Sequence, residues 1–139
     1  MHTQAGTKWR TIESEVNHAG WPSVEFASGC AEGTVSLLVA WASQAYLLKF
    51  HLVSMALGCS ETLYWTLAEE KTRPQAVLTE IENSAMVADC ERVRGGPLKH
   101  FLISGGDMCC EIIAHEAFDL TRFESEDAAR LAVAREYAQ

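Results

Sequence analysis

Three residues in the last third of the chain have side chains that, held together, could carry out nucleophilic catalysis. His100, Cys109 and Glu111 lie on either side of a Gly-Gly pair at 105–106. Gly-Gly between two strand-like runs is typical of a tight β-hairpin, because both glycines accept a positive φ. Such a hairpin would bring a thiol, an imidazole and a carboxylate onto one face. There the imidazole can lower the pKa of the thiol, and the carboxylate can orient the imidazole.

The register of this hairpin decides which of the three side chains meet. Pairing of Ile103 with Met108 places His100 directly opposite Glu111, with Cys109 diagonally across. Residues side by side on strands rarely give the geometry that acyl transfer needs, and no turn suited to an oxyanion hole adjoins them. We therefore expect a cross-strand polar pair with Cys109 as a packing group. A small hydrolase or transferase that uses Cys109, His100 and Glu111 is the alternative.

Basic residues cluster at one place in the chain, around a Gly-Gly-Pro turn at 95–97. Arg92, Arg94 and Lys99 are candidates there for binding an anion, with glycine N–H groups as additional donors. The segment lacks the spacing and the strand-to-helix context of a phosphate-binding loop. We expect a solvated, charged loop rather than an anion site.

The five cysteines predict reduced thiols and no metal centre. No Cys-x-x-Cys pair occurs, and no histidine lies at zinc-finger spacing from two cysteines, so we expect neither a structural metal nor a cofactor. Cys109 and Cys110 are adjacent, but neighbouring strand side chains point to opposite faces, so a bridge between them would distort the strand. The first ten residues contain no apolar signal, and the sequence therefore predicts a cytoplasmic protein with thiols packed as small apolar groups.

The charge balance argues against nucleic-acid and membrane partners. Eleven Lys and Arg stand against nineteen Asp and Glu, a formal net charge of −8, so the protein repels phosphate backbones and anionic lipid surfaces. Residues 34–58 carry Lys49 as their only formal charge, but they include serines, a glutamine and a histidine, which a membrane-spanning helix disfavours. We expect no nucleic-acid partner and no membrane span.

The composition and the pattern of elements predict a single α+β domain spanning 1–139. Apolar residues make up 48% of the 139-residue chain, enough for one core, and no repeat or linker divides it. We expect an antiparallel sheet of about five to seven strands, with about three helices packed mainly on its apolar face. The predicted helices include one at the N-terminus on Trp9, Ile12 and Val16, one over 74–85 and one over 126–138; strands are predicted over 23–28, over 87–93 and in two hairpins.

The charge-poor stretch is most simply a β-hairpin over 34–53. With Trp41 opposite Tyr46, strand alternation sorts eight large apolar residues onto one face: Val35, Leu37, Val39, Trp41, Tyr46, Leu48, Phe50 and Leu52. Ser43-Gln44 is a poor two-residue turn, so one buried helix over 34–57 stays open. The run 62–67 alternates like a strand, although Ser60 and Glu61 can equally start a helix across 61–70. We favour strands in both segments.

The four tryptophans and the many other large apolar side chains exceed what one thin layer of sheet and helices needs to bury. Exposed apolar patches on monomers are normally small, so we expect a homodimer that leaves a mostly apolar cleft. Candidate lining residues are Trp41, Tyr46, His51 and Trp65. Such a cleft would hold a small apolar ligand or a peptide segment of a protein partner.

Two resemblances accompany this interpretation. The order of predicted elements, the acidity and the size are similar to those of the class I type III secretion chaperones, although the strands expected over 62–67 and 87–93 depart from their pattern. That resemblance implies a homodimer that binds an unfolded effector segment. In general character the chain also resembles the proteins carried by mobile integron gene cassettes, which implies a small cytoplasmic oligomer. The sequence alone thus favours a binding protein over an enzyme.

Overall fold

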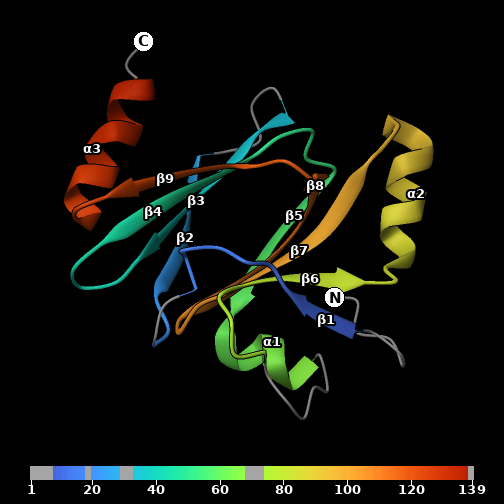
Figure 1. Cartoon of the computed structure of the whole chain (residues 1–139), viewed down its shortest axis with the longest axis horizontal. Helices are drawn as coiled ribbons and strands as arrows, with labels where there is room; N and C mark the ends of the chain where they lie inside the picture. The colour runs from blue at the N-terminus through green and yellow to red at the C-terminus, as the bar shows by residue number, and fades with distance from the viewer. Residues whose placement is uncertain (1–7, 18–19, 29–32, 68–73, 138–139) are drawn as a thin grey trace.

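The computed structural model describes residues 8–17, 20–28, 33–67 and 74–137. Within these residues, nine strands and three helices follow one another along the chain (Figure 1). In chain order they are β1 (Lys8–Thr11), β2 (Ser23–Ser28), β3 (Val35–Ala40), β4 (Ala45–Phe50), β5 (Met55–Ser60), α1 (Glu61–Leu67), β6 (Leu78–Glu82), α2 (Ala85–Arg94), β7 (Leu98–Ser104), β8 (Met108–His115), β9 (Asp119–Phe123) and α3 (Glu126–Tyr137). The α+β class is confirmed, with more strands than the number expected.

The strands form two antiparallel sheets. The five-stranded sheet has the order β1-β6-β7-β8-β5, and the four-stranded sheet has the order β2-β3-β4-β9. Apolar side chains of both sheets meet in one cluster, in which Leu37 and Leu48 of the four-stranded sheet join Phe101 and Ile112 of the five-stranded sheet. The two sheets therefore pack face to face, each hiding its more apolar side against the other.

The helices cover the outer faces of this sandwich. α1 packs on the five-stranded sheet, where Tyr64 joins Leu102 and Cys109 in a second cluster. α2 lies along β7 of the same sheet, whereas α3 lies on the four-stranded sheet, where Ala129 meets Leu38 (Figure 1). The prediction that the helices pack on the apolar face of one sheet is wrong, because that face is covered by the second sheet.

Both predicted hairpins form, and in each the register differs by two residues from the expected one. Val39 rather than Trp41 lies opposite Tyr46, and Ser104 lies opposite Cys109. A shift of two residues keeps every side chain on its predicted face. The apolar residues expected inside are accordingly 1% exposed or less: Val35, Leu37, Val39, Leu48, Phe50, Phe101, Ile103 and Ile112. Two of the eight residues expected on the inner face of 34–53 differ: Trp41 is half-buried, and Leu52, which lies beyond the end of β4, is 52% exposed.

Two helix predictions are wrong because strand pairing overrides a short helical spacing. The N-terminal segment forms β1, in which Trp9 lies opposite Ile81. Part of the segment 74–85 forms β6, which pairs with β1 on one side and β7 on the other. Leu78 lies in the core between the sheets and Ile81 in the outer cluster, so each face of β6 contributes one large apolar side chain. Two apolar residues three positions apart fit one face of a helix as well as they fit the two faces of a strand.

Two strand predictions are also wrong. Residues 61–67 form α1, and the N–H of Leu63 donates to Ser60 Oγ at 3.3 Å, so the open alternative of a helix starting at Ser60 is the one that forms. Residues 68–70, the rest of that expected segment, lie outside the described residues. The segment 87–93 belongs to α2. Strands β5 and β9, which lie at sheet edges, have no counterpart among the predicted elements.

The C-terminal helix and the strand over 23–28 form where they are predicted. Ser125 caps α3 by accepting a hydrogen bond from the N–H of Ala128 at 3.1 Å. Because five strands precede the first helix in the described chain, the observed order differs from the helix-first order of the secretion chaperones. Among the described residues, no helix combines the length and the apolar character that crossing a membrane requires.

Truncation of Leu37 tests the face-to-face packing. Leu37 is 0% exposed, so Leu37→Ala should leave a cavity between the sheets and lower the unfolding free energy by about 2–5 kcal/mol. Leu131→Ala is the matched control on α3, where the side chain is 52% exposed, and should change it by less than about 0.5 kcal/mol. Urea unfolding followed by tryptophan fluorescence measures both, and equal losses would contradict the packing.

Candidate active site at the start of helix α2

A histidine and a glutamate form the centre of the candidate site. His100 on β7 and Glu111 on β8 point to the outer face of the five-stranded sheet, away from the core between the sheets. His100 lies opposite Ile113, and Glu111 lies opposite Leu102, so the two polar side chains are diagonal neighbours rather than direct ones. His100 Nε2 is 2.6 Å from Glu111 Oε1. The shifted register thus preserves the contact, because diagonal neighbours are within reach of long side chains.

The protonation state of Glu111 follows from its surroundings. Both His100 and Glu111 are 1% exposed. Burial raises the pKa of Glu111, but the hydrogen bond and the charge of His100 lower it by more, so the pKa lies below its usual value. Glu111 is therefore an ionised carboxylate in neutral solution.

The ionised carboxylate fixes the tautomer of His100. A carboxylate only accepts hydrogen bonds, so Nε2 of His100 carries the proton that it donates to Glu111. In the neutral ring Nδ1 is then an acceptor. Ser84 Oγ lies 2.8 Å from Nδ1, so the Ser84 hydroxyl donates to Nδ1 when the ring is neutral. In that state the hydrogen bonds run in one direction, from Ser84 to His100 to Glu111.

Ser84 occupies the junction between β6 and α2. It is the N-cap residue of α2, and Asn83 before it has a φ of 57°, a left-handed conformation that asparagine tolerates better than most residues. An N-cap serine normally accepts a hydrogen bond from the first turn of its helix, but the side chain of Ser84 makes no such bond. Its hydroxyl is directed at His100 instead, beside the positively polarised start of α2.

A cavity of about 240 Å³ opens beside Ser84 and His100. Its wall combines apolar side chains with three charged ones: Ile81, Val87, Ala88, Leu98, Glu80, Glu91 and Lys99. Lys99 Nζ lies 3.8 Å from Glu80, so part of this charge is neutralised within the wall. Ser84 is partly exposed, whereas His100 and Glu111 are buried behind it. A small molecule in the cavity can therefore reach the hydroxyl but not the carboxylate.

Tyr64 of α1 borders the same pair of residues. Burial raises the pKa of Tyr64, and the charge of Glu111 raises it further, so its hydroxyl stays protonated. The Tyr64 hydroxyl and Glu111 Oε2 are both buried on this side of the pair, and the Tyr64 hydroxyl helps to lower the pKa of Glu111.

Cys109, the predicted nucleophile, lies on the same face but outside the hydrogen-bonded chain. It is 1% exposed and pairs with Ser104 on β7. The two ring nitrogens of His100 face Ser84 and Glu111, so the hydroxyl of Ser84 occupies the place expected for the thiol. The sequence signal for Ser84 is the Asn-Ser pair directly before a helix, which is typical of an N-cap. A predicted helix over 74–85 places this pair near the end of a helix, so the sequence analysis does not identify Ser84 as an N-cap.

The structure does not bring the four aromatic and histidine candidates for a ligand cleft together. Trp41 and Tyr46 stack edge to face at 6.0 Å at the core between the sheets. Trp65 lies on the far side of the five-stranded sheet, 6.0 Å from Trp9. His51 is partly exposed, with Nε2 at 2.8 Å from the carboxylate of Asp119. The five-stranded sheet therefore separates Trp65 from Trp41 and Tyr46.

The three basic candidates are also separated, and only Lys99 lines the cavity beside Ser84. Arg92 forms an ion pair with Asp89 one turn earlier on α2. Arg94 lines another cavity, of about 300 Å³, together with Cys90. Within the described residues, no group of three or more His, Cys, Asp or Glu side chains is placed to hold a metal ion.

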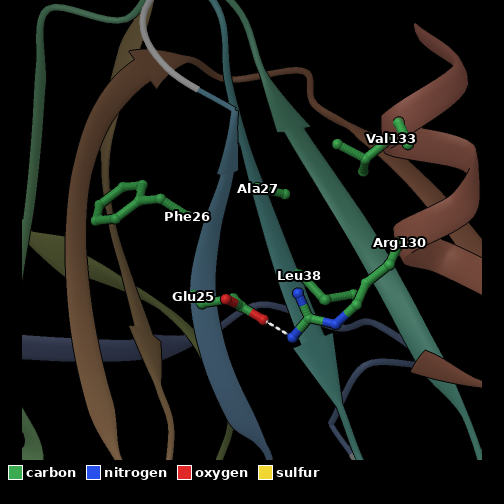
Figure 2. Close-up of a pocket in the computed structure, with 7 residues that line it drawn as sticks. Glu25, Phe26, Ala27, Leu38, Arg130 and Val133 are labelled. Atoms are coloured by element: carbon green, nitrogen blue, oxygen red, sulfur yellow. Dashed lines mark hydrogen bonds and ion pairs between the residues drawn. The ribbon is translucent and has the colours of Figure 1, made fainter. Parts of the chain in front are cut away.

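A further cavity, of about 200 Å³, lies between α3 and the outer face of the four-stranded sheet. Figure 2 shows Arg130 reaching from α3 toward Glu25 on β2, with Val133 above it and Phe26 on the opposite side of the strand. Arg130 Nε also donates to the carboxylate of Glu126 at 3.0 Å. The charged groups of this cavity thus pair with one another, and the rest of its lining is mostly apolar.

Comparisons with known proteins give no relative for this chain. No family model matches it, no curated protein matches it, and no solved structure matches it.

The low pKa of Glu111 predicts how stability depends on pH. A carboxylate whose pKa is lower in the folded state than in the unfolded state stabilises the fold at pH values above its unfolded pKa, which is near 4.5. This stabilisation is lost as the pH falls through the lower pKa of the folded state. Glu111→Gln keeps an acceptor for His100 but removes the titrating group. Urea unfolding of both proteins at neutral pH and below pH 4.5 should show a larger acid-induced loss for the wild type. Equal losses would contradict an ionised Glu111.

Proposed function

We propose that this protein is a small serine-dependent hydrolase or acyltransferase that acts on short acyl esters. Ser84 is the nucleophile, His100 is the general base, and Glu111 orients His100 and stabilises its protonated form. The observation that carries the proposal is the hydrogen-bonded chain from the hydroxyl of Ser84, a partly exposed residue, through His100 to the ionised Glu111. The hydroxyl contacts Nδ1 and the carboxylate contacts Nε2. Since a neutral imidazole has one donor and one acceptor nitrogen, either nitrogen can serve as the base.

In the first half of the reaction, Nδ1 of His100 takes the proton of Ser84 while Oγ forms a bond to the carbonyl carbon of the ester. The carbonyl oxygen gains the negative charge. The N–H groups at the start of α2 lie beside Ser84 and carry partial positive charge, so they are the groups that stabilise this oxyanion. The bond to the leaving alkoxide then breaks, and the alkoxide takes the proton from Nδ1.

In the second half, His100 removes a proton from water and the oxygen of that water adds to the acyl carbon. The bond to Ser84 Oγ breaks, Oγ regains its proton from His100, and a carboxylic acid is released. An alcohol in place of water gives acyl transfer by the same steps. Glu111 stays ionised throughout, because its low pKa disfavours taking the proton from the imidazolium.

The direction of the Ser84 hydroxyl supports this function over a purely structural polar pair. A structural interpretation accounts for His100 and Glu111, which satisfy each other in a buried place. It does not account for an N-cap serine that leaves the first turn of its own helix without a side-chain bond. The size of the cavity, about 240 Å³, lies below the range usual for drug-sized ligands and suits an acyl group of a few carbons.

Replacement of Ser84 tests the proposal directly. Ser84→Ala should lower the rate of p-nitrophenyl acetate hydrolysis by about 100-fold or more, because the alanine has no nucleophile for the acyl group. Ser125→Ala is the matched control: it removes the N-cap hydroxyl of α3, at a cost in stability of about 1 kcal/mol, and should keep the wild-type rate. Release of p-nitrophenolate at neutral pH measures the rate, and circular dichroism checks the fold.

A fluorophosphonate probe gives a readout that does not depend on the choice of ester. Ser84 Oγ should displace fluoride and form a stable phosphonyl ester, which intact-mass spectrometry detects in the wild type and in Ser125→Ala but not in Ser84→Ala. Turnover of the ester by Ser84→Ala at the wild-type rate would overturn the proposal. So would a wild-type protein that neither hydrolyses the ester nor takes up the probe.

A second candidate function, binding of a small apolar ligand, is favoured by the cavity beside α3 (Figure 2). Ala27, Leu38, Val133 and Ala134 provide apolar lining there, and the Glu25–Arg130 ion pair marks its polar side. The homodimer, the peptide partner and the cytoplasmic location expected from the sequence stay predictions, as does the integron-cassette character.

Filling this cavity tests the second candidate. Val133→Trp should lower the fluorescence enhancement of 1-anilinonaphthalene-8-sulfonate by several-fold, because the indole occupies the space that the dye would take. Leu131→Trp, at an exposed position of the same helix, is the control and should leave the enhancement unchanged. Equal dye binding by both variants would show that the cavity is not a ligand site.

A further inference from the structure

Two cysteines face each other across neighbouring strands near the candidate site. Cys59 on β5 lies directly opposite Cys109 on β8, in a ladder that runs from Met55 to Ser60. Both thiols belong to the cluster on the outer face of the five-stranded sheet, where Tyr64 covers them. Cys110, the next residue along the chain, points to the core between the sheets.

The ladder geometry places the two cysteines within bonding reach. The N–H of Glu61 donates to the carbonyl of Asp107 at 3.0 Å, which marks a hydrogen-bonded position of this antiparallel pair. Such positions recur every second residue, so Cys59 and Cys109 occupy the next one. Residues there have Cα atoms about 5.5 Å apart. Disulfides span Cα separations of roughly 4.4–6.8 Å, so a bridge needs no movement of the chain beyond local adjustment.

The position of β5 allows that adjustment and admits an oxidant. β5 is an edge strand with β8 as its one neighbour in the sheet, so it can shift without breaking a second ladder. Cys59 is partly exposed, whereas Cys109 is 1% exposed. An oxidant therefore reaches Cys59 first, and Cys109 lies in place to react with the oxidised sulfur.

We propose that Cys59 and Cys109 are a redox pair that a peroxide converts into a cross-strand disulfide. Cys59 loses its thiol proton, its sulfur attacks one oxygen of hydrogen peroxide, and the O–O bond breaks. Cys59 becomes a sulfenic acid, and the departing hydroxide combines with the released proton to form water. The sulfur of Cys109 then attacks the sulfur of Cys59, the S–O bond breaks, and the departing hydroxide leaves as a second water with the thiol proton of Cys109. Two thiols are oxidised and one peroxide is reduced to two waters. This inference does not depend on the proposed hydrolase activity.

The other described cysteines are poorly placed to compete. Cys110 lies on the opposite face of β8 from Cys59; burial raises the pKa of both thiols, that of Cys110 to about 12. Cys90 lies on α2 and lines the cavity with Arg94. The pairing should therefore be specific to Cys59 and Cys109.

Thiol counting and peptide mapping test the pairing. The reduced protein, treated with a small excess of hydrogen peroxide and then denatured, should show three reactive thiols instead of five. After alkylation and tryptic digestion, a peptide containing Cys59 should be joined to the peptide containing Cys109, with a mass lower by two hydrogen atoms than their sum. Cys110→Ala should keep this link, which assigns it to Cys109, and Cys90→Ser should also keep it.

Cys59→Ser and Cys109→Ala should each abolish the link and the loss of thiols. Cys59 is at a partly exposed edge position, so its variant is expected to fold, and circular dichroism verifies this. A link from Cys59 to Cys110 or to any other cysteine would overturn the proposal. So would oxidation of Cys59 that proceeds to the sulfinic acid with Cys109 still alkylated.

Discussion

Burial of β7 and β8 on both faces is the constraint on which this structure depends. Every residue of β8 from Cys109 to Ala114 is buried. The inner face packs against the four-stranded sheet, and the outer face packs under α1 and α2. A strand pair enclosed in this way has no water to solvate its polar side chains, so His100 and Glu111 must satisfy each other. The polar pair and the helices above it are therefore parts of one packing arrangement.

The parts of the fold that sequence reasoning predicts are those in which one face of a strand is much more apolar than the other. Strand alternation over 34–53 assigns the inner residues correctly even though the register is shifted by two, because such a shift leaves the faces unchanged. On either side of Ser84 the predictions are reversed: the sequence predicts a helix where β6 forms and a strand where α2 forms. The two large apolar residues of β6 lie three positions apart on opposite faces, and α2 has no buried residue, so neither segment shows the periodicity of its own structure.

The same limits explain what could be predicted of the candidate site. His100 and Glu111 come together through a hairpin whose Gly-Gly turn is visible in the sequence, so their contact could be anticipated. Ser84 reaches His100 through the β6–α2 junction, and no local signal shows that this junction folds over β7. Cys109 shares a face with His100, which is why the sequence favours it over Ser84 as the nucleophile. Tertiary packing decides which atom faces Nδ1, and it places the hydroxyl of Ser84 there.

The missing side-chain bond at the start of α2 has a consequence for how this chain can change. A serine at position 84 that turned toward its helix would stabilise α2 by capping the first turn. An aspartate there would cap the same turn and would add a negative charge at the positively polarised end of the helix. Either change would take the hydroxyl away from His100. Selection for a more stable helix and selection for a hydroxyl on the imidazole thus act in opposite directions at this one position, which is the trade-off between stability and activity often found at functional sites.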